Sequence, residues 1–154
     1  TELTRLFVGG MIERRRGGIL NVASTAAFQP GPNLAVYYAT KAYVLSFTEA
    51  LHEELSGSGV AVTCLCPGPT ATELVADAGM QHTLLFRRGV MSATDVARSG
   101  YRGFRRGRAV VITGMRNRLG TLLVRVSPRR VTRQVVKQLQ AVDSPRLGES
   151  SETI

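Results

Sequence analysis

The chain has 154 residues, of which 44% are hydrophobic and 20% charged, a composition typical of a folded globular domain rather than a disordered segment. No apolar run approaches the roughly 18 residues that a membrane span needs, and no secretory signal leads the chain. The net charge of +9 lies in residues 71–154, which hold 15 basic and 6 acidic side chains, whereas residues 1–70 hold 5 of each.

The first two elements are predicted to be a helix and a strand. Apolar side chains recur at helical spacing through residues 2–15, at Leu3, Leu6, Phe7 and Met11. Gly17 and Gly18 are expected to end this helix. Residues 18–24 (GILNVAS) are mostly apolar, as is typical of a strand with both faces covered.

The middle of the chain repeats this alternation. Pro30, Gly31 and Pro32 indicate a loop over residues 25–36. Residues 37–56 form a second helix, whose core stripe is Val44, Phe47, Leu51 and Leu55. Residues 60–66 (VAVTCLC) are predicted to be a second buried strand, ended by Pro67 and Gly68.

The remaining elements end in a basic region. The capping-box pattern of residues 70–73 predicts a short helix, followed by an irregular segment over residues 80–90. Ser92 is expected to begin a helix that runs to about Arg106. Residues 108–113 (RAVVIT) are expected to form a third strand. Two short basic amphipathic helices and a polar tail follow. Strands that alternate with helices favour a parallel α/β sheet with right-handed crossovers.

Two cysteines and two histidines contribute no recognisable site. Cys64 and Cys66 lie two apart on one strand, where both thiols point to the same face, and two thiols alone do not form a zinc site. We therefore predict reduced, buried cysteines, a cytoplasmic protein and no metal site. Neither His52 nor His82 lies in the context of a catalytic triad.

Three side chains suit carbonyl and alcohol chemistry. Tyr37 and Lys41 are four residues apart on the second helix and so share a face, and Ser24 lies at the carboxyl end of the first strand. An ammonium close to a phenol favours the phenolate, which helps the phenol to exchange a proton with an alcohol. Taken alone, a Tyr-x-x-x-Lys pattern is weak evidence, because Tyr37 can equally be a helix-start aromatic and Lys41 a solvated side chain.

Three motifs together resemble the catalytic half of the short-chain dehydrogenase/reductase family. They are Asn21-Val22-Ala23-Ser24, Tyr37-Tyr38-Ala39-Thr40-Lys41 and Cys66-Pro67-Gly68-Pro69-Thr70-Ala71-Thr72. Tyr38 lies three residues before Lys41 rather than four, so it does not fit the Tyr-x-x-x-Lys spacing. The basic tail is similar to that of the DltE-like branch of the family, whose substrates are unassigned.

The resemblance implies hydride transfer between NAD or NADP and a carbonyl carbon. By this resemblance Ser24 polarises the carbonyl, Tyr37 is the acid/base, and Lys41 assists the phenol and binds the nicotinamide ribose. Pro67, Gly68, Thr70 and Thr72 match positions that contact the nicotinamide or the phosphates.

The resemblance also implies a domain organisation. Residues 1–114 are expected to be the C-terminal half of a Rossmann-type doubly wound parallel sheet with about three parallel strands, residues 115–141 a basic helical extension and residues 142–154 a polar tail. The family's Gly-rich phosphate loop and its Asn-Asn-Ala-Gly segment do not occur in residues 1–154. We therefore expect a fragment of a longer enzyme that is inactive and poorly stable alone, with an aggregation-prone apolar edge at residues 18–24.

Several interpretations of partners stay open. Residues 86–137 hold 14 basic side chains and one acid, Asp95, which suits a solvated face or peripheral membrane contact through residues 115–141 better than nucleic acid. In the resembled family, helices corresponding to 2–15 and 37–56 often form a dimer interface. Phe28, Leu84, Leu85 and Phe86 either line a pocket for an apolar carbonyl substrate or pack ordinarily. The alternative to an enzyme is a truncated, non-catalytic relic that acts as a basic membrane- or partner-binding module.

Overall fold

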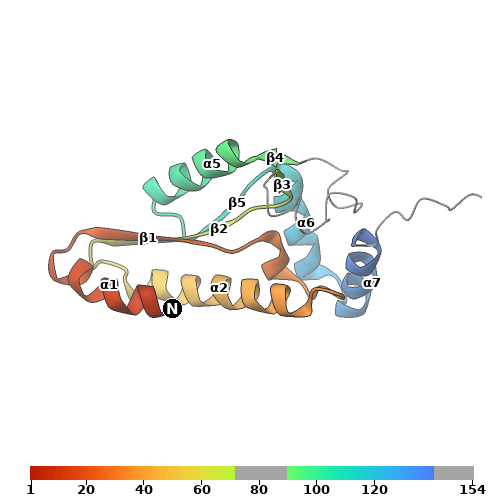
Figure 1. Ribbon diagram of the computed structural model, residues 1–154, viewed down its shortest axis with the longest axis horizontal. Coiled ribbons are helices and arrows are strands. Elements are labelled where there is room, and N and C mark those ends of the chain that lie inside the picture. The colour runs from red at the N-terminus through yellow and green to blue at the C-terminus, as the bar shows by residue number, and fades with distance from the viewer. Residues whose placement is uncertain (72–89, 141–154) are drawn as a thin grey trace, which may run out of the picture.

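The computed structural model describes residues 1–71 and 90–140 and shows a three-layer α/β arrangement (Figure 1). Its central sheet has the order β1-β2-β5, with all strands parallel: β1 (Gly17–Val22), β2 (Val60–Cys66) and β5 (Val110–Ile112). Helices α1 (Glu2–Glu13) and α2 (Ala35–Glu54) lie on one face, and α5 (Ala93–Arg105) lies on the other. The predicted parallel α/β fold is therefore confirmed.

Two adjacent glycines of β1 show how the layers fit together. A Cβ at Gly17 would lie 2.5 Å from Met11 Cγ of α1, and a Cβ at Gly18 would lie 2.2 Å from Phe104 Cζ of α5. Successive strand residues point to opposite faces, so the two glycines admit one helix from each side. The prediction that they end α1 was wrong, because that helix already ends at Glu13, with Arg14 as its C-cap, and the chain turns at Arg15, whose φ is +49°.

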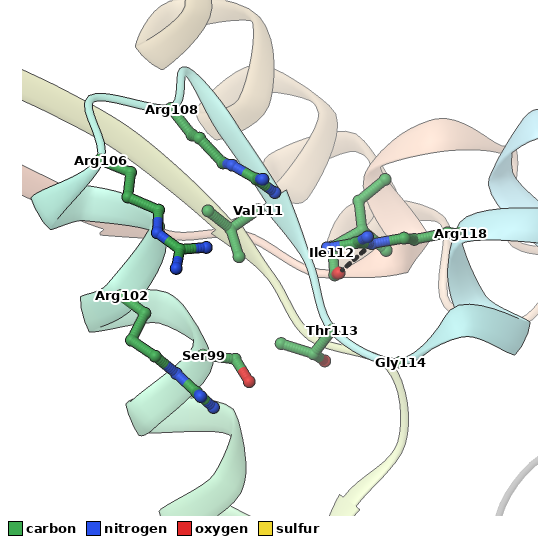
Figure 2. A pocket seen from close by; sticks show the side chains of 10 residues that line it. Ser99, Arg102, Arg106, Arg108, Val111, Ile112, Thr113, Gly114 and Arg118 are labelled. Carbon is green, nitrogen blue, oxygen red and sulfur yellow. Dashed lines mark hydrogen bonds between the residues drawn. The ribbon is translucent and has the colours of Figure 1, made fainter.

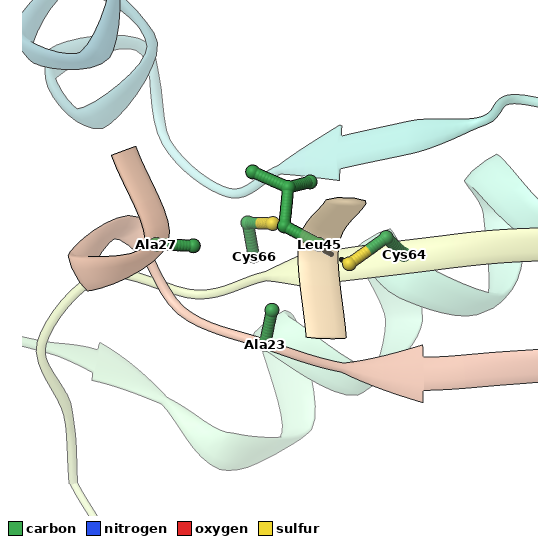
Figure 3. Packing of buried hydrophobic residues seen from close by; sticks show 5 residues of the cluster. All are labelled: Ala23, Ala27, Leu45, Cys64 and Cys66. Carbon is green, nitrogen blue, oxygen red and sulfur yellow. Dashed lines mark hydrogen bonds between the residues drawn. The ribbon is translucent and has the colours of Figure 1, made fainter. Parts of the chain in front are cut away.

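The core lies around β2, the central strand. Val62, Cys64 and Cys66 of this strand are almost completely enclosed. Figure 3 shows the cluster at its carboxyl end, in which the thiols of β2 pack with an α2 side chain and with alanines beyond β1; its buried members are Ala23, Ala27, Leu45, Cys64 and Cys66. A second cluster joins Leu51 of α2 and its C-cap residue, Leu55, to the other end of β2. The predicted apolar stripe of α2 is therefore confirmed.

The predicted helix at residues 70–73 does not begin where the capping pattern places it. Residues Thr70–Ala71 instead form β3, which pairs in parallel with β4 (Met91–Ser92). The Thr70 hydroxyl donates to Gly68 O at 2.9 Å, a backward bond to the preceding turn. Residues 72–89, which include the predicted irregular segment, lie outside the described part of the chain.

The basic region forms two helices, as expected. Helix α6 (Met115–Val126) follows β5, and α7 (Arg129–Leu139) begins after Pro128. Both lie at the carboxyl end of the sheet (Figure 1). A short 3-10 helix, η1 (Thr25–Phe28), occupies the start of the predicted loop and contacts both α2 and α6. Phe28 packs against the core cluster beside the thiols, which favours the ordinary-packing interpretation of this residue.

One edge of the sheet and one helix face are exposed. β1 pairs only with β2 among the described strands, and its Leu20 and Val22 are 38% and 52% exposed. On α1, the predicted stripe is split, because Met11 packs on the sheet while Leu3, Leu6 and Phe7 lie in solvent. Among residues 1–71 and 90–140, no helix is both long and apolar enough to span a bilayer.

Candidate active site

The carboxyl ends of the parallel strands bring the predicted site residues to one edge of the sheet. Pairing between the first two strands continues beyond their ends, since Ala23 N donates to Leu65 O and Thr25 N donates to Pro67 O, both at 2.8 Å. These bonds fix Ser24 beside the turn that follows β2. Open parallel sheets gather their ligands at such strand ends.

Ser24 begins η1 and has an extended backbone, with φ −171° and ψ 164°. Its Oγ accepts a hydrogen bond from Ala26 N at 3.1 Å, the usual contact of a helix-capping serine. A hydroxyl has one hydrogen to donate and two lone pairs. Because the capping bond occupies only a lone pair, Ser24 retains its O–H as a donor.

Tyr37 is the third residue of α2, since the helix begins at Ala35 rather than at the predicted residue 37. It is 41% exposed, and its hydroxyl makes no hydrogen bond to another described residue. The Lys41 ammonium lies over its ring, 5.8 Å from the ring centroid, within the range of a cation–π contact. The structure thus brings Tyr37 and Lys41 together on one accessible helix face, as predicted.

Lys41 reaches from α2 to the end of β1. Its Nζ donates to Val22 O at 3.1 Å. Since Ala23 N points toward β2, the preceding carbonyl lies on the opposite, free side of β1. An ammonium has three donors, so two remain for other partners. Between Ser24 and Tyr37 no hydrogen bond is present.

The neighbouring Tyr38 has a different environment. It is 6% exposed and packs with Ala26 of η1 and Val136 of α7. Its hydroxyl accepts a hydrogen bond from Gln140 Nε2 at 2.5 Å. Burial raises the pKa of the Tyr38 phenol above its ordinary value. Tyr38 is therefore a packing residue, in agreement with its frame relative to Lys41.

The turn after β2 is held by a residue that the sequence analysis missed. The Asn117 amide of α6 lies against Gly68, where a Cβ would approach Asn117 Nδ2 to 2.2 Å. Asn117 Nδ2 also donates to Thr113 O at 2.7 Å and so joins the end of β5 to this turn. The only sequence signal was an asparagine shortly after the Thr113-Gly114 strand end. Thr72 lies outside the described residues.

Other polar side chains of α2 and of the sheet have structural partners. Asn21 Nδ2 donates to Thr48 Oγ1 at 3.0 Å, and His52 Nδ1 lies 2.7 Å from Val62 O. The thiols of Cys64 and Cys66 are free and 3.8 Å apart, and the hydrogen bond between them, with burial, raises the pKa of Cys66. Within residues 1–71 and 90–140, no three His, Cys, Asp or Glu side chains come together as metal ligands would.

Curated relatives align with slightly less than half of the chain. The Bos taurus very-long-chain 3-oxoacyl-CoA reductase is 45% identical over 73 residues, which are 47% of this chain and 23% of the relative. An uncharacterized oxidoreductase of Myxococcus xanthus is 44% identical over 66 residues, which are 43% of this chain and 26% of the relative. The aligned segment thus spans about a quarter of these curated proteins.

Solved structures resemble more of the chain. A short-chain dehydrogenase from Sphingobium yanoikuyae in complex with NADPH has a TM-score of 0.62 at 29% identity, covering 88% of this chain and 52% of its own. A short-chain dehydrogenase/reductase from Burkholderia phymatum in complex with NAD has a TM-score of 0.63 at 27% identity, covering 78% and 51%. The chain spans about half of each neighbour.

The family model described as short chain dehydrogenase matches residues 1–82, more than half of the 154 residues. That segment contains α1, β1, η1, α2 and β2, and with them Ser24, Tyr37 and Lys41. The sequence match and the parallel α/β architecture agree. This chain belongs to the short chain dehydrogenase family.

Proposed function

We propose that this chain carries the carbonyl-handling residues of an NAD(P)-dependent oxidoreductase that interconverts a carbonyl and an alcohol by hydride transfer. The observation that carries the proposal is the pairing of an accessible Tyr37 phenol with the Lys41 ammonium at the carboxyl edge of a parallel sheet. Family membership and the oxidoreductase relatives support the same reaction class.

Each of the three side chains has a distinct task in this reaction. The free O–H of Ser24 donates to the substrate carbonyl oxygen and polarises it. Tyr37 transfers its phenolic proton to the alkoxide oxygen as that oxygen gains negative charge, and takes it back in the reverse direction. The Lys41 ammonium stabilises the phenolate that remains. Bound NAD(P) would supply or accept the hydride at the carbonyl carbon.

The residues present fit the nicotinamide end of such a cofactor. The two remaining donors of Lys41 suit a pair of ribose hydroxyls, and the Pro67-Gly68 turn lies at the adjacent strand end. Thr70 Oγ1 donates to Gly68 O and still has lone pairs to accept a further bond. We assign Lys41, Tyr37, Pro67, Gly68 and Thr70 to this end, with Thr72 by its position in the motif. Neighbours of this fold bind NADPH or NAD, and the choice between them is left open.

An apolar substrate is favoured by a hollow that Thr25, the residue after Ser24, helps to line. The cavity has a volume of about 380 Å³ and reaches Thr25 and Gln29. Its walls come largely from α6 and α7, with Leu123, Val131, Val135, Val136 and Leu139 as apolar lining. Such a volume suits a small ligand with an apolar body. The 3-oxoacyl-CoA reductase relatives lead us to propose a long-chain acyl carbonyl compound as the substrate class.

We infer that the active protein contains more of the sheet than residues 17–112 provide. The free edge of β1 exposes Leu20 and Val22, and a further parallel strand there would cover them. In this organisation residues 1–114 form the C-terminal half of the Rossmann-type domain, and α6 and α7 form a helical extension, as in the DltE-like branch.

A homodimer through α1 and α2 is supported by exposed apolar side chains on both helices. Leu3, Leu6 and Phe7 of α1 and Tyr43 of α2 are all at least half exposed, and Thr1 Oγ1 lies 2.6 Å from the Tyr43 hydroxyl. The start of α1 thus lies beside the middle of α2, and both helices present exposed apolar side chains. Sedimentation of the full-length protein tests this, with a dimer that Phe7→Glu dissociates as the expected result and an unchanged monomer as the contrary one.

The second candidate function, a basic membrane-binding module, is favoured by α6. This helix exposes Met115, Leu119, Leu122 and Val126, and its other positions include Arg116, Arg118 and Arg125. An amphipathic helix of this type can lie in the surface of an anionic bilayer. Sedimentation with liposomes, with and without anionic lipid, tests this function. A Leu119→Glu/Leu122→Glu variant that binds as well as the parent would contradict it.

The two adjacent tyrosines provide a matched test of the catalytic proposal. In the full-length protein, Tyr37→Phe should reduce NAD(P)H-dependent reduction of a long-chain 3-oxoacyl thioester by at least about 100-fold, the typical contribution of general acid–base catalysis. Tyr38→Phe removes the same atom one position away and should leave turnover within about threefold. Near-normal turnover by Tyr37→Phe, or an equal loss in both variants, would refute the assignment.

A further inference from the structure

A second cavity lies on the opposite face of the sheet from Tyr37 and Lys41. It is bounded by the last turns of α5, by β5 and by the start of α6, and has a volume of about 190 Å³ (Figure 2). Four arginines from these separate segments line it: Arg102, Arg106, Arg108 and Arg118. We name it the arginine cavity. Neither the proposed reaction nor the comparisons assign it a role.

Among the residues that the structure describes, no acidic side chain lines the arginine cavity. Residues 90–140 contain 12 basic side chains and one acid, Asp95. The Asp95 carboxylate accepts a hydrogen bond from Ser92 Oγ at the N-terminal end of α5, whereas Arg102 and Arg106 lie at its C-terminal end. Cations are favourable at a helix C-terminus, which accounts for these two arginines. It does not account for Arg108 and Arg118, which come from other elements.

Most of the hydrogen-bond donors in the arginine cavity are unused. The guanidinium groups of Arg106 and Arg108 make no hydrogen bond to another described residue. Arg118 uses its Nε for Ile112 O at 3.1 Å (Figure 2). Arg102 uses its Nε for Arg98 O at 3.3 Å. The terminal nitrogens of both guanidinium groups remain. Guanidinium groups present several donors in a rigid fork. The arginine cavity therefore offers donors well in excess of its acceptors.

A buried hydroxyl in the same wall is also unsatisfied. Thr113 is 1% exposed and lines the arginine cavity, and its Oγ1 has no hydrogen-bond partner among the described residues. Buried polar atoms nearly always have a partner, whether protein, water or ligand. Both the arginines and Thr113 therefore indicate a polar occupant.

We propose that the arginine cavity binds the phosphate or diphosphate group of a ligand. The guanidinium fork matches phosphate oxygens in bidentate geometry, and several such forks lining one cavity favour a dianion over chloride. A volume of about 190 Å³ equals roughly six water molecules at about 30 Å³ each. This space encloses a phosphoanion and is below the roughly 300 Å³ usual for a whole drug-sized ligand. The rest of a larger phosphorylated molecule would extend into solvent.

Calorimetric titration of the full-length protein with inorganic pyrophosphate tests the proposal, with sodium chloride of equal ionic strength as the reference. We expect saturable binding of pyrophosphate. Arg106→Gln/Arg108→Gln should weaken it at least about tenfold, because charge-assisted hydrogen bonds are lost. The control Arg129→Gln/Arg130→Gln on α7 removes the same net charge from exposed positions outside the arginine cavity and should bind like the parent.

Two further measurements separate the source of the phosphate from the effect of net charge. Arg106→Lys/Arg108→Lys keeps the charge without the fork and should bind with intermediate affinity. Vesicles of phosphatidylcholine with phosphatidic acid, competed with pyrophosphate, distinguish a lipid headgroup from a soluble phosphorylated compound. If pyrophosphate releases the protein from the vesicles, the arginine cavity binds a lipid headgroup. If pyrophosphate leaves vesicle binding unchanged, the arginine cavity binds a soluble phosphorylated compound. Absence of saturable pyrophosphate binding, or equal losses in the Gln variants of the arginine cavity and of α7, would overturn the proposal.

Discussion

The contact between α5 and β5 depends on a helical glycine, and Gly103→Ala measures that dependence. A Cβ at Gly103 would lie 2.1 Å from Val111 Cγ2 and 3.3 Å from both Val111 Cβ and Cγ1. Val111 is 4% exposed, and a β-branched side chain has restricted χ1 rotation. The valine cannot simply turn away, so the helix must shift on the sheet.

The expected magnitude follows from two opposing effects. Replacing a glycine by alanine inside a helix stabilises it by about 1 kcal/mol, whereas overpacking a core costs about 1–3 kcal/mol. The control is Gly120→Ala in α6, where a Cβ would meet nothing within 4 Å. Both variants gain the same helix propensity. The free energy of unfolding of Gly103→Ala should therefore be about 1–3 kcal/mol below that of Gly120→Ala.

Urea denaturation followed by circular dichroism measures both values in the full-length protein. A Val111→Ala background removes Cγ1 and Cγ2, so Gly103→Ala should cost little in that background even though Val111→Ala is itself destabilising. If Gly103→Ala stabilises the protein as much as Gly120→Ala does, the packing of α5 on β5 described here is wrong.

Three other predictions concern buried polar groups. Thr48→Val leaves the Asn21 amide without its acceptor and should lower the unfolding free energy by about 1–3 kcal/mol in urea denaturation, while Thr40→Val at an exposed site should cost less than about 0.5 kcal/mol. The raised pKa of Tyr38 keeps its phenol protonated in the fold, whereas the unfolded phenol ionises near pH 10, so stability is lost as pH rises above about 10. The destabilisation caused by Tyr38→Phe should then be smaller at pH 10.5 than at pH 8, and an unchanged difference would contradict this assignment. Cys64 and Cys66 are fully buried and free, so iodoacetamide should label neither in the native protein and both in urea; labelling of the native protein would disprove their burial.

The elements with a clear period were predictable from sequence because the period itself reflects burial. The apolar run of residues 60–66 became the central strand β2, enclosed on both faces, and the stripe of α2 packs as its spacing indicates. Local signals failed where long-range contacts compete with them. Thr70 does not begin a helix, as its capping pattern predicts, but pairs in a strand with Met91, twenty-one residues later. No local pattern reveals such a pairing.

The candidate site shows the same division. The spacing of Tyr37 and Lys41 is enough to place them on one helix face. The four-residue spacing to Lys41 also distinguishes Tyr37 from Tyr38, in agreement with the exposure of the first and the burial of the second. The sequence did not reveal that Lys41 binds Val22 O or that Asn117 lies against the Pro67-Gly68 turn. The first contact joins residues that are 19 positions apart in the chain, and the second joins residues that are 49 positions apart. Only the folded chain defines such contacts.

The sequence by itself determined the order of the longer helices and of the three strands of the central sheet, the parallel fold class and the three side chains of the proposed reaction. Periodicity, turn residues and short spacings are local properties, so they can be read without the fold. The tertiary structure alone decided which faces are covered, which carbonyl the lysine contacts and that arginines from α5, α6 and the turn before β5 line one cavity with the buried Thr113 hydroxyl. Such convergence depends on how the helices pack across the sheet, and packing is a property of the whole chain rather than of any segment.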